Sequence, residues 1–180
     1  MHALTPCLKV LLLAAALIGV LYAYGSYSLR QVPEEASFME PAVRRRAVRL
    51  FETGHALPAR GTIVWFEHPD YPGRMLISRV VGLPGDRIAI RGGRLVRDGE
   101  RVSEEYAPRR LDGEELEEIV VPAGHFYALN DARTDPGSPA LDSRRLGPRP
   151  FASIVGRIGD RAAEEAARKT AVRGVRGGVR

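Results

Sequence analysis

Apolar residues are concentrated in one long run near the start of the chain. Residues 10–24 read VLLLAAALIGVLYAY, and no charged side chain lies between Lys9 and Arg30. Because roughly 20 apolar helical residues cross a bilayer, this pattern predicts a transmembrane anchor at residues 10–29, preceded by a short N-terminal flank at residues 1–9. A secretory signal that is cleaved after Ala23 is the alternative interpretation.

Beyond residue 60 the apolar residues occur in short runs that are rich in β-branched and aromatic side chains. Glycine and proline separate these runs, and the pairs Gly92-Gly93 and Asp98-Gly99 are typical of tight hairpin turns. We expect strands at residues 62–66, 75–81, 87–90, 94–97, 100–102, 118–121, 125–129 and 153–158. This spacing predicts a mainly β fold, an antiparallel barrel or sandwich at residues 30–159. The acidic segment 112–118 is expected to be an exposed loop or turn.

The C-terminal end has a different pattern. Asp160 can cap a helix at residues 160–172, in which acidic residues come early and basic residues late, as the helix dipole favours. Residues 173–180 are rich in glycine and arginine and are expected to form a disordered basic tail. Such a tail can contact phospholipid or nucleic acid, but it has no aromatic residues for base stacking, so we expect no nucleic-acid partner.

The composition of the chain excludes several classes of protein and of site. The 180 residues allow one ordinary domain, and 44% hydrophobic with 27% charged residues excludes global disorder. The single cysteine, Cys7, excludes an intramolecular disulfide and a cysteine-cluster metal site, and we expect no metal and no cofactor. The net charge of +5 is carried by arginine, since only Lys9 and Lys169 are lysines.

Four segments, in order, resemble the boxes of signal peptidase I, the membrane-anchored serine protease that removes signal peptides from exported proteins. They are Met39-Glu-Pro41, GTIVWF at residues 61–66, RVVGLPGD at residues 79–86, and PAGHFYALNDAR at residues 122–133, which is followed by Asp142-Ser-Arg144. The fourth segment is similar to the family pattern P-x-G-x-Y-F-x-x-G-D-N-R. The resemblance implies a single-pass protein of the cell membrane, with residues 1–9 in the cytoplasm and the β domain outside it.

The same resemblance implies peptide hydrolysis by a serine–lysine dyad. A serine hydroxyl needs an adjacent base, and lysine can serve when it is desolvated, whereas arginine does not lose its proton. In the family's register the nucleophile position is Phe38, the lysine position is Ser78, and the serine that helps to hold the lysine is replaced by Ala140. We therefore expect a degenerate active site in a retained frame, formed by Met39, Pro41, Arg79, Asp131, Arg133, Asp142, Ser143 and Arg144.

Several alternatives stay open. Ser37 lies one residue before the expected nucleophile and could act with an unidentified base, but His55, His68 and His125 are better explained as surface or packing residues. A repressor-like self-cleaving protein also uses a serine–lysine pair, but the anchor and the missing helix-turn-helix argue against it. A basic protein that binds lipid or nucleic acid through its tail is the third alternative.

The sequence thus favours a signal peptidase homologue that has lost catalysis. The expected partners are exported proteins or their signal peptides, the lipid bilayer and an active signal peptidase paralogue. An extended peptide is expected to pair with an exposed strand edge near residues 75–81. Asp142 and Arg144 are expected to form an ion pair that orders their loop.

Overall fold

The computed structural model describes residues 6–33, 38–44, 46–53, 57–107, 113–133 and 141–158, without the side chains of residues 6, 7 and 21–24. Ser37, His55, Ala140, the expected helix at residues 160–172 and the expected tail at residues 173–180 lie outside the described residues.

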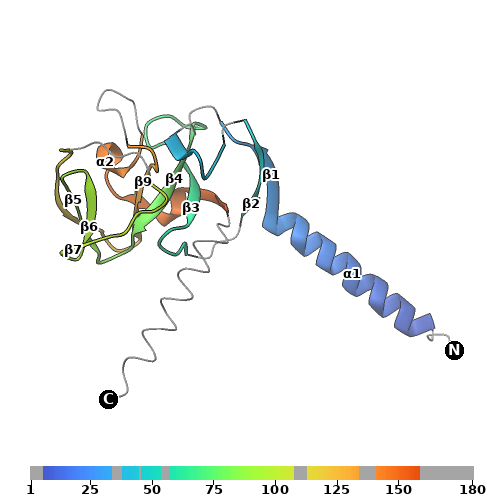
Figure 1. Cartoon of the computed structure of the whole chain (residues 1–180). Coiled ribbons are helices and arrows are strands. Elements are labelled where there is room, and N and C mark those ends of the chain that lie inside the picture. Colours follow the sequence, from blue (N-terminus) through green and yellow to red (C-terminus); the bar gives the residue numbers. More distant parts are fainter. Residues whose placement is uncertain are drawn as a thin grey trace, which may run out of the picture.

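The described strands form two antiparallel sheets (Figure 1). Going across the seven-stranded sheet, the order is β1 (Tyr27–Gln31), β2 (Val48–Glu52), β11 (Ile154–Ile158), β3 (Ile63–Glu67), β4 (Met75–Gly82), β9 (His125–Leu129) and β10 (Arg149–Pro150). The four-stranded sheet has the order β7 (Glu100–Arg101), β6 (Arg94–Arg97), β5 (Arg87–Arg91) and β8 (Leu116–Val120). The predicted mainly β antiparallel fold is confirmed, in the form of two open sheets and not a closed barrel.

All eight expected strands are found, with their ends shifted by at most a few residues. Both hairpin turns are also present: Asp98 and Gly99 have φ values of 53° and 83°, as a two-residue primed turn requires. The expectation of an exposed loop over residues 112–118 was wrong at its end, because Leu116 begins β8 and packs against a buried apolar cluster. The sequence did not predict β1, β2, β10 or the short helix α2 (Ser143–Leu146).

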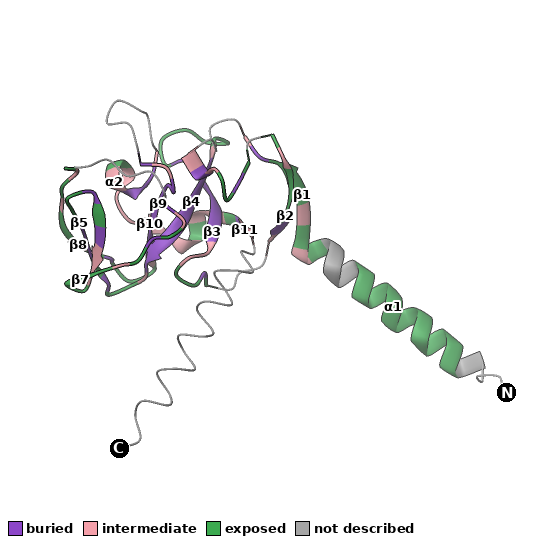
Figure 2. Ribbon diagram, in the orientation of Figure 1, coloured by how far each residue is buried: buried purple, intermediate pink, exposed green. Residues whose placement is uncertain are grey.

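Strand β4 runs through the middle of the domain and is buried on both faces (Figure 2). Ile77 packs into one apolar cluster with Trp65 and Phe51, while Leu76 and Val80 pack into another cluster around Phe126. Because side chains alternate along a strand, residue 78 shares the face of Leu76 and Val80. The lysine position of the family is therefore inside an apolar layer.

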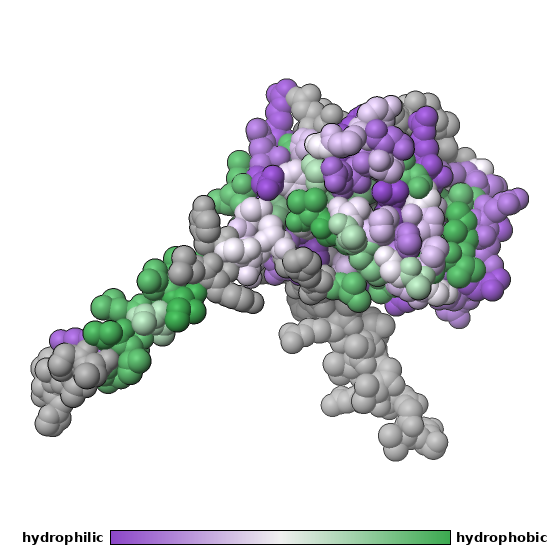
Figure 3. All heavy atoms as spheres, turned by 180° about the vertical axis from the view of Figure 1, so that it is seen from behind, coloured by the Kyte–Doolittle hydropathy of each residue, from purple (hydrophilic) through white to green (hydrophobic). Residues whose placement is uncertain are grey.

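Helix α1 (Pro6–Ser26) projects away from the β domain (Figure 1). Its described apolar side chains, including Leu11, Leu13 and Ile18, are exposed along its length (Figure 3). The helix ends before the expected anchor does, because residues 27–29 belong to β1 and pair with β2. Within the part of the chain that the structure describes, no helix meets both the length and the hydropathy needed to cross a membrane.

Candidate functional site

Ser78 lies in the middle of β4, with Val64 opposite it on β3. On the other side, the pairing of Arg79 with Leu129 places Asn130 beside it. Ser78 is completely buried, and its Oγ donates a hydrogen bond of 2.8 Å to Oδ1 of Asn130, which is also buried. Among the described residues this amide is the hydroxyl's only hydrogen-bond partner, so the expected lysine position contains a neutral serine–asparagine pair.

Phe38, at the expected nucleophile position, is half-buried at the start of a short turn. Its carbonyl oxygen accepts a hydrogen bond of 2.8 Å from the backbone N–H of Ala132. The next residue, Met39, is fully buried in the apolar cluster that contains Ile77, whereas Pro41 is exposed. The backbone of Phe38 is therefore held against the segment 130–133, which also carries the partner of Ser78.

An ion pair between Arg79 and Asp131 fixes this segment to β4. The guanidinium donates two hydrogen bonds to the carboxylate, of 2.8 and 2.7 Å, and both side chains are buried. A third hydrogen bond of 2.8 Å goes from Arg79 Nη1 to the carbonyl of Gly61, and the guanidinium lies 4.3 Å from the ring centroid of Tyr106. Burial raises the pKa of Tyr106 above its ordinary value, so this phenol is a neutral hydroxyl and not a base at neutral pH.

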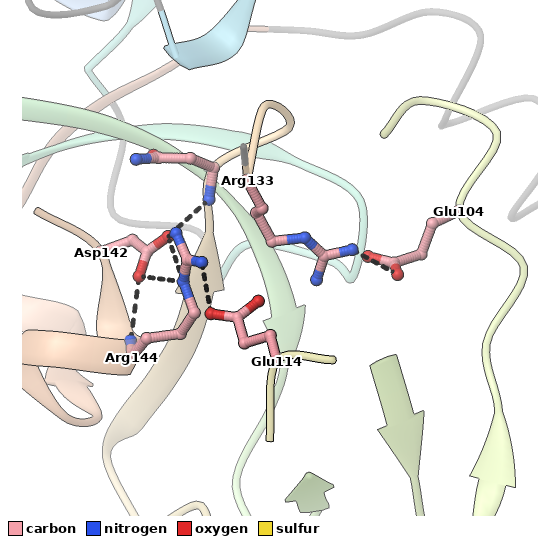
Figure 4. A network of polar contacts seen from close by, with 6 residues as sticks. Glu104, Glu114, Arg133, Asp142 and Arg144 are labelled. Atoms are coloured by element: carbon pink, nitrogen blue, oxygen red, sulfur yellow. Dashed lines mark hydrogen bonds and ion pairs between the residues drawn. The ribbon is translucent and has the colours of Figure 1, made fainter. Parts of the chain in front are cut away.

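A second buried ion pair joins Arg133 to Glu104, with Nη2 and Oε2 separated by 2.6 Å (Figure 4). Glu104 follows β7, so this contact ties the segment 130–133 to the part of the chain that forms the four-stranded sheet. Glu104 was not predicted as a site residue, because nothing in its local sequence distinguishes it from the acidic residues around it. Its role depends on a partner 29 residues away.

The Asp142-Ser-Arg144 segment lies along the edge of β9 that faces β10, beyond the two residues that β10 pairs with. Asp142 Oδ2 accepts a hydrogen bond of 3.0 Å from the N–H of Asn130, and Ser143 Oγ accepts one of 2.9 Å from the N–H of Ala128. Two side chains thus satisfy backbone groups that a neighbouring strand would otherwise bind. This segment acts on the site by holding the backbone of residue 130 in place.

Arg144 completes this arrangement (Figure 4). Its Nη2 lies 2.8 Å from Asp142 Oδ2, and its Nη1 lies 2.7 Å from Glu114 Oε1. Burial alone would lower the pKa of Arg144, but the hydrogen bonds and charges of Asp142 and Glu114 raise it above its ordinary value. The predicted Asp142–Arg144 ion pair is confirmed, and Glu114 is a half-buried partner, whereas an exposed loop was expected there.

Neither of the two described histidines, His68 and His125, is hydrogen-bonded to Phe38 or Ser78. His68 is buried against the ring of Tyr71, its Nδ1 accepts a hydrogen bond of 3.0 Å from the N–H of Asp70, and burial lowers its pKa. The Nδ1 of His125 lies 2.9 Å from the carbonyl oxygen of Ala123. Both rings are used in local contacts, as expected for packing residues.

The RVVGLPGD box has a structural role in the turn after β4. Asp86 Oδ2 accepts a hydrogen bond of 2.8 Å from the N–H of Leu83, and the carboxylate receives two more, of 2.8 and 2.6 Å, from Arg60. Burial alone would raise the pKa of Asp86, but the hydrogen bonds from Arg60 and Leu83 outweigh it and hold the pKa below its ordinary value. A Cβ at Gly82 would lie 2.9 Å from Ile88 Cγ1, so this position needs glycine.

The chain is similar in sequence to known signal peptidases and to a membrane protease. The chain is 28% identical to the mitochondrial ATP-independent inner membrane protease subunit 1b of Arabidopsis thaliana, over 76% of this chain and 65% of that protein. It is 32% identical to signal peptidase I V of Bacillus subtilis, over 61% of this chain and 67% of that protein. It therefore spans about two thirds of these relatives.

Among solved structures, a signal peptidase I of Enterococcus faecalis is similar to 58% of this chain, over 98% of its own length, with 28% identity and a TM-score of 0.48. The profile of the family described as signal peptidase, peptidase S26, matches residues 5–161. The chain therefore belongs to the signal peptidase family, peptidase S26.

Proposed function

We propose that this chain is a non-catalytic signal peptidase homologue that binds extended segments of exported proteins or their signal peptides, or assists an active paralogue. The observation that carries this proposal is the state of Ser78: a buried hydroxyl, hydrogen-bonded to the amide of Asn130. Neither side chain is a base at neutral pH.

The neighbouring charges do not replace the missing base. Arg79 and Arg133 are the cations closest in sequence to Ser78 and Asn130, and both are hydrogen-bonded to buried carboxylates. A guanidinium does not lose its proton in proteins, and a carboxylate bound to it is a weak proton acceptor. Phe38, at the nucleophile position, has no hydroxyl to activate. An active enzyme that uses Ser37 and an unidentified base is the alternative that the experiment below distinguishes.

Strand β4 supports a peptide-binding role, although its free edge is shorter than expected. β4 pairs with β3 along its first half, but with β9 only from Arg79 onward. Within the described strands, residues 75–77 therefore have a partner on one side only, next to Ser78. A peptide can add to such an edge through backbone hydrogen bonds.

The exposed apolar surface supports a location at the cell membrane, with helix α1 as a single-pass anchor and the β domain outside the cytoplasm. Helix α1 is followed in the chain by β1, and Leu29 of β1 lies opposite Leu50 of β2. These two leucines are 71% and 53% exposed, and contiguous exposed apolar surface is typical of an interaction site. A lipid surface would cover the helix and the two leucines together.

Peptide binding by the full chain in detergent micelles tests this function. A fluorescently labelled signal peptide should bind saturably, with an anisotropy change, and should be recovered intact by mass spectrometry. The matched control is the same peptide with N-methyl groups on alternate backbone nitrogens, which removes the donors that strand addition needs. Equal binding of both peptides would contradict the edge-binding role. Cleavage that is lost in Ser37→Ala would instead support the active alternative.

A further inference from the structure

We propose that the side chain of Asn130 occupies the space that a lysine at position 78 would need. Residues 78 and 130 together then determine whether this site can hold a general base. The inference rests on the proposed function, since it concerns why the site has no base. Both residues depart from the family boxes at once: serine stands at the lysine position, and asparagine stands where the fourth box has glycine. The structure brings these two departures into direct contact.

The contact obstructs a longer side chain at position 78 in the direction that Ser78 Oγ takes. Ser78 Oγ and Asn130 Oδ1 are 2.8 Å apart, and the two residues are 0% and 4% exposed. In the rotamer that Ser78 adopts, a lysine or methionine would place its Cγ near the position of Oγ. Carbon approaches a carbonyl oxygen only to about 3.3–3.6 Å, so the amide of Asn130 would obstruct the new side chain at its first methylene.

The surroundings would otherwise suit a neutral amine. Val64 lies opposite Ser78 on β3, and Leu76 and Val80 share its face of β4. Desolvation by apolar neighbours lowers the pKa of a lysine, as a general base requires. With Asn130 in place, the amine cannot settle among these apolar neighbours, so its pKa stays closer to the ordinary value of about 10.4. Asn130 is thus a positioning residue that decides whether a lysine at position 78 can become a base.

The first test measures the pKa of a lysine introduced at position 78. The chain has only two lysines, Lys9 and Lys169, so a protein labelled with ¹³C at lysine Cε gives one new signal in Ser78→Lys. We expect its pKa to be lower in Ser78→Lys/Asn130→Gly than in Ser78→Lys, by about one pH unit or more. Asn130→Gly keeps the backbone N–H that binds Asp142, so the loop retains that contact.

The second test distinguishes a steric effect of Asn130 from an electrostatic one, because it uses no lysine. Ser78→Met adds an uncharged side chain of similar length, and its melting temperature is compared with those of Asn130→Gly and the double variant. If Asn130 obstructs the position, the double variant melts at a higher temperature than Ser78→Met alone. Val80→Met, on the same face of β4, is the matched control and should show no such rescue by Asn130→Gly.

Two results would overturn the inference. One is a lysine pKa that is the same with asparagine and with glycine at position 130. The other is a melting temperature of the Ser78→Met/Asn130→Gly variant that is no higher than that of Ser78→Met. Neither measurement uses enzymatic activity, so signal-peptide cleavage by the natural chain would refute the proposed function and leave this test unaffected.

Discussion

Replacing Asp142 by alanine should weaken the domain through three contacts that the structure makes explicit. The carboxylate of Asp142 caps α2 by accepting a hydrogen bond from the N–H of Arg144, and it accepts another from the buried N–H of Asn130. It also forms an ion pair with the guanidinium of Arg144. Loss of an N-cap costs about 1 kcal/mol, and leaving a buried N–H unsatisfied costs about 1–3 kcal/mol. Arg144 keeps Glu114, so the ion pair adds less than the roughly 3–5 kcal/mol of a fully broken buried pair.

We therefore expect Asp142→Ala to lower the free energy of unfolding by about 2–5 kcal/mol, or roughly 4–20 °C in melting temperature. Asp142→Asn keeps one acceptor oxygen and should lose less. Urea unfolding can be followed by the fluorescence of Trp65, the only tryptophan of the chain. Its ring centroid lies 4.4 Å from that of Phe51. Glu117→Ala, an exposed acidic change on β8, is the control and should shift stability by less than about 0.5 kcal/mol. Equal urea midpoints for Asp142→Ala and Glu117→Ala would refute the role given to Asp142.

Three further predictions follow from the turn after β4 and from the exposed apolar surface. The pKa of Asp86 is held below its ordinary value, so its stabilisation is present above about pH 4 and is lost as the pH falls further. The urea midpoints of the natural chain and Asp86→Asn should therefore approach each other as the pH falls below about 4, and a constant difference would contradict this. Gly82→Ala should cost about 1–3 kcal/mol through its clash with Ile88, and Ile88→Val should relieve part of that loss in urea unfolding. Leu29→Ser should reduce vesicle co-flotation of the full chain relative to the exposed control Val120→Ser; equal flotation would exclude β1 from the lipid contact.

The strands that could be predicted are those whose own residues show an apolar run or a turn signal. Residues 75–81 are apolar except for Ser78 and Arg79, as suits a strand that is buried on both faces. Asp98-Gly99 takes the positive φ values that a primed turn needs. β1 escaped prediction because residues 27–29 were assigned to the end of the expected anchor. β2 escaped it because its apolar residues Val48 and Leu50 are exposed and flank Arg49. β10 and α2 have two and four residues, too few for any periodic signal.

The candidate site could be predicted only as positions in the family boxes. Phe38 and Ser78 follow from the register of the motifs, but the partner of Ser78 depends on which residue β9 places opposite it. The one available signal was the asparagine that stands in place of the glycine of the fourth box. Glu104 had no such signal, since its ion pair with Arg133 joins segments that meet only in the folded domain.

The most direct test of the account is cleavage of a signal-peptide-bearing preprotein by the purified full chain, beside a catalytically competent signal peptidase I as positive control. The processed product is quantified over several hours by mass spectrometry, for the natural chain, Ser37→Ala and Ser78→Ala. The account predicts no product above the enzyme-free background in all three. Turnover by the natural chain that disappears in either serine variant would show that a hydroxyl in this site is activated after all, and would contradict the account.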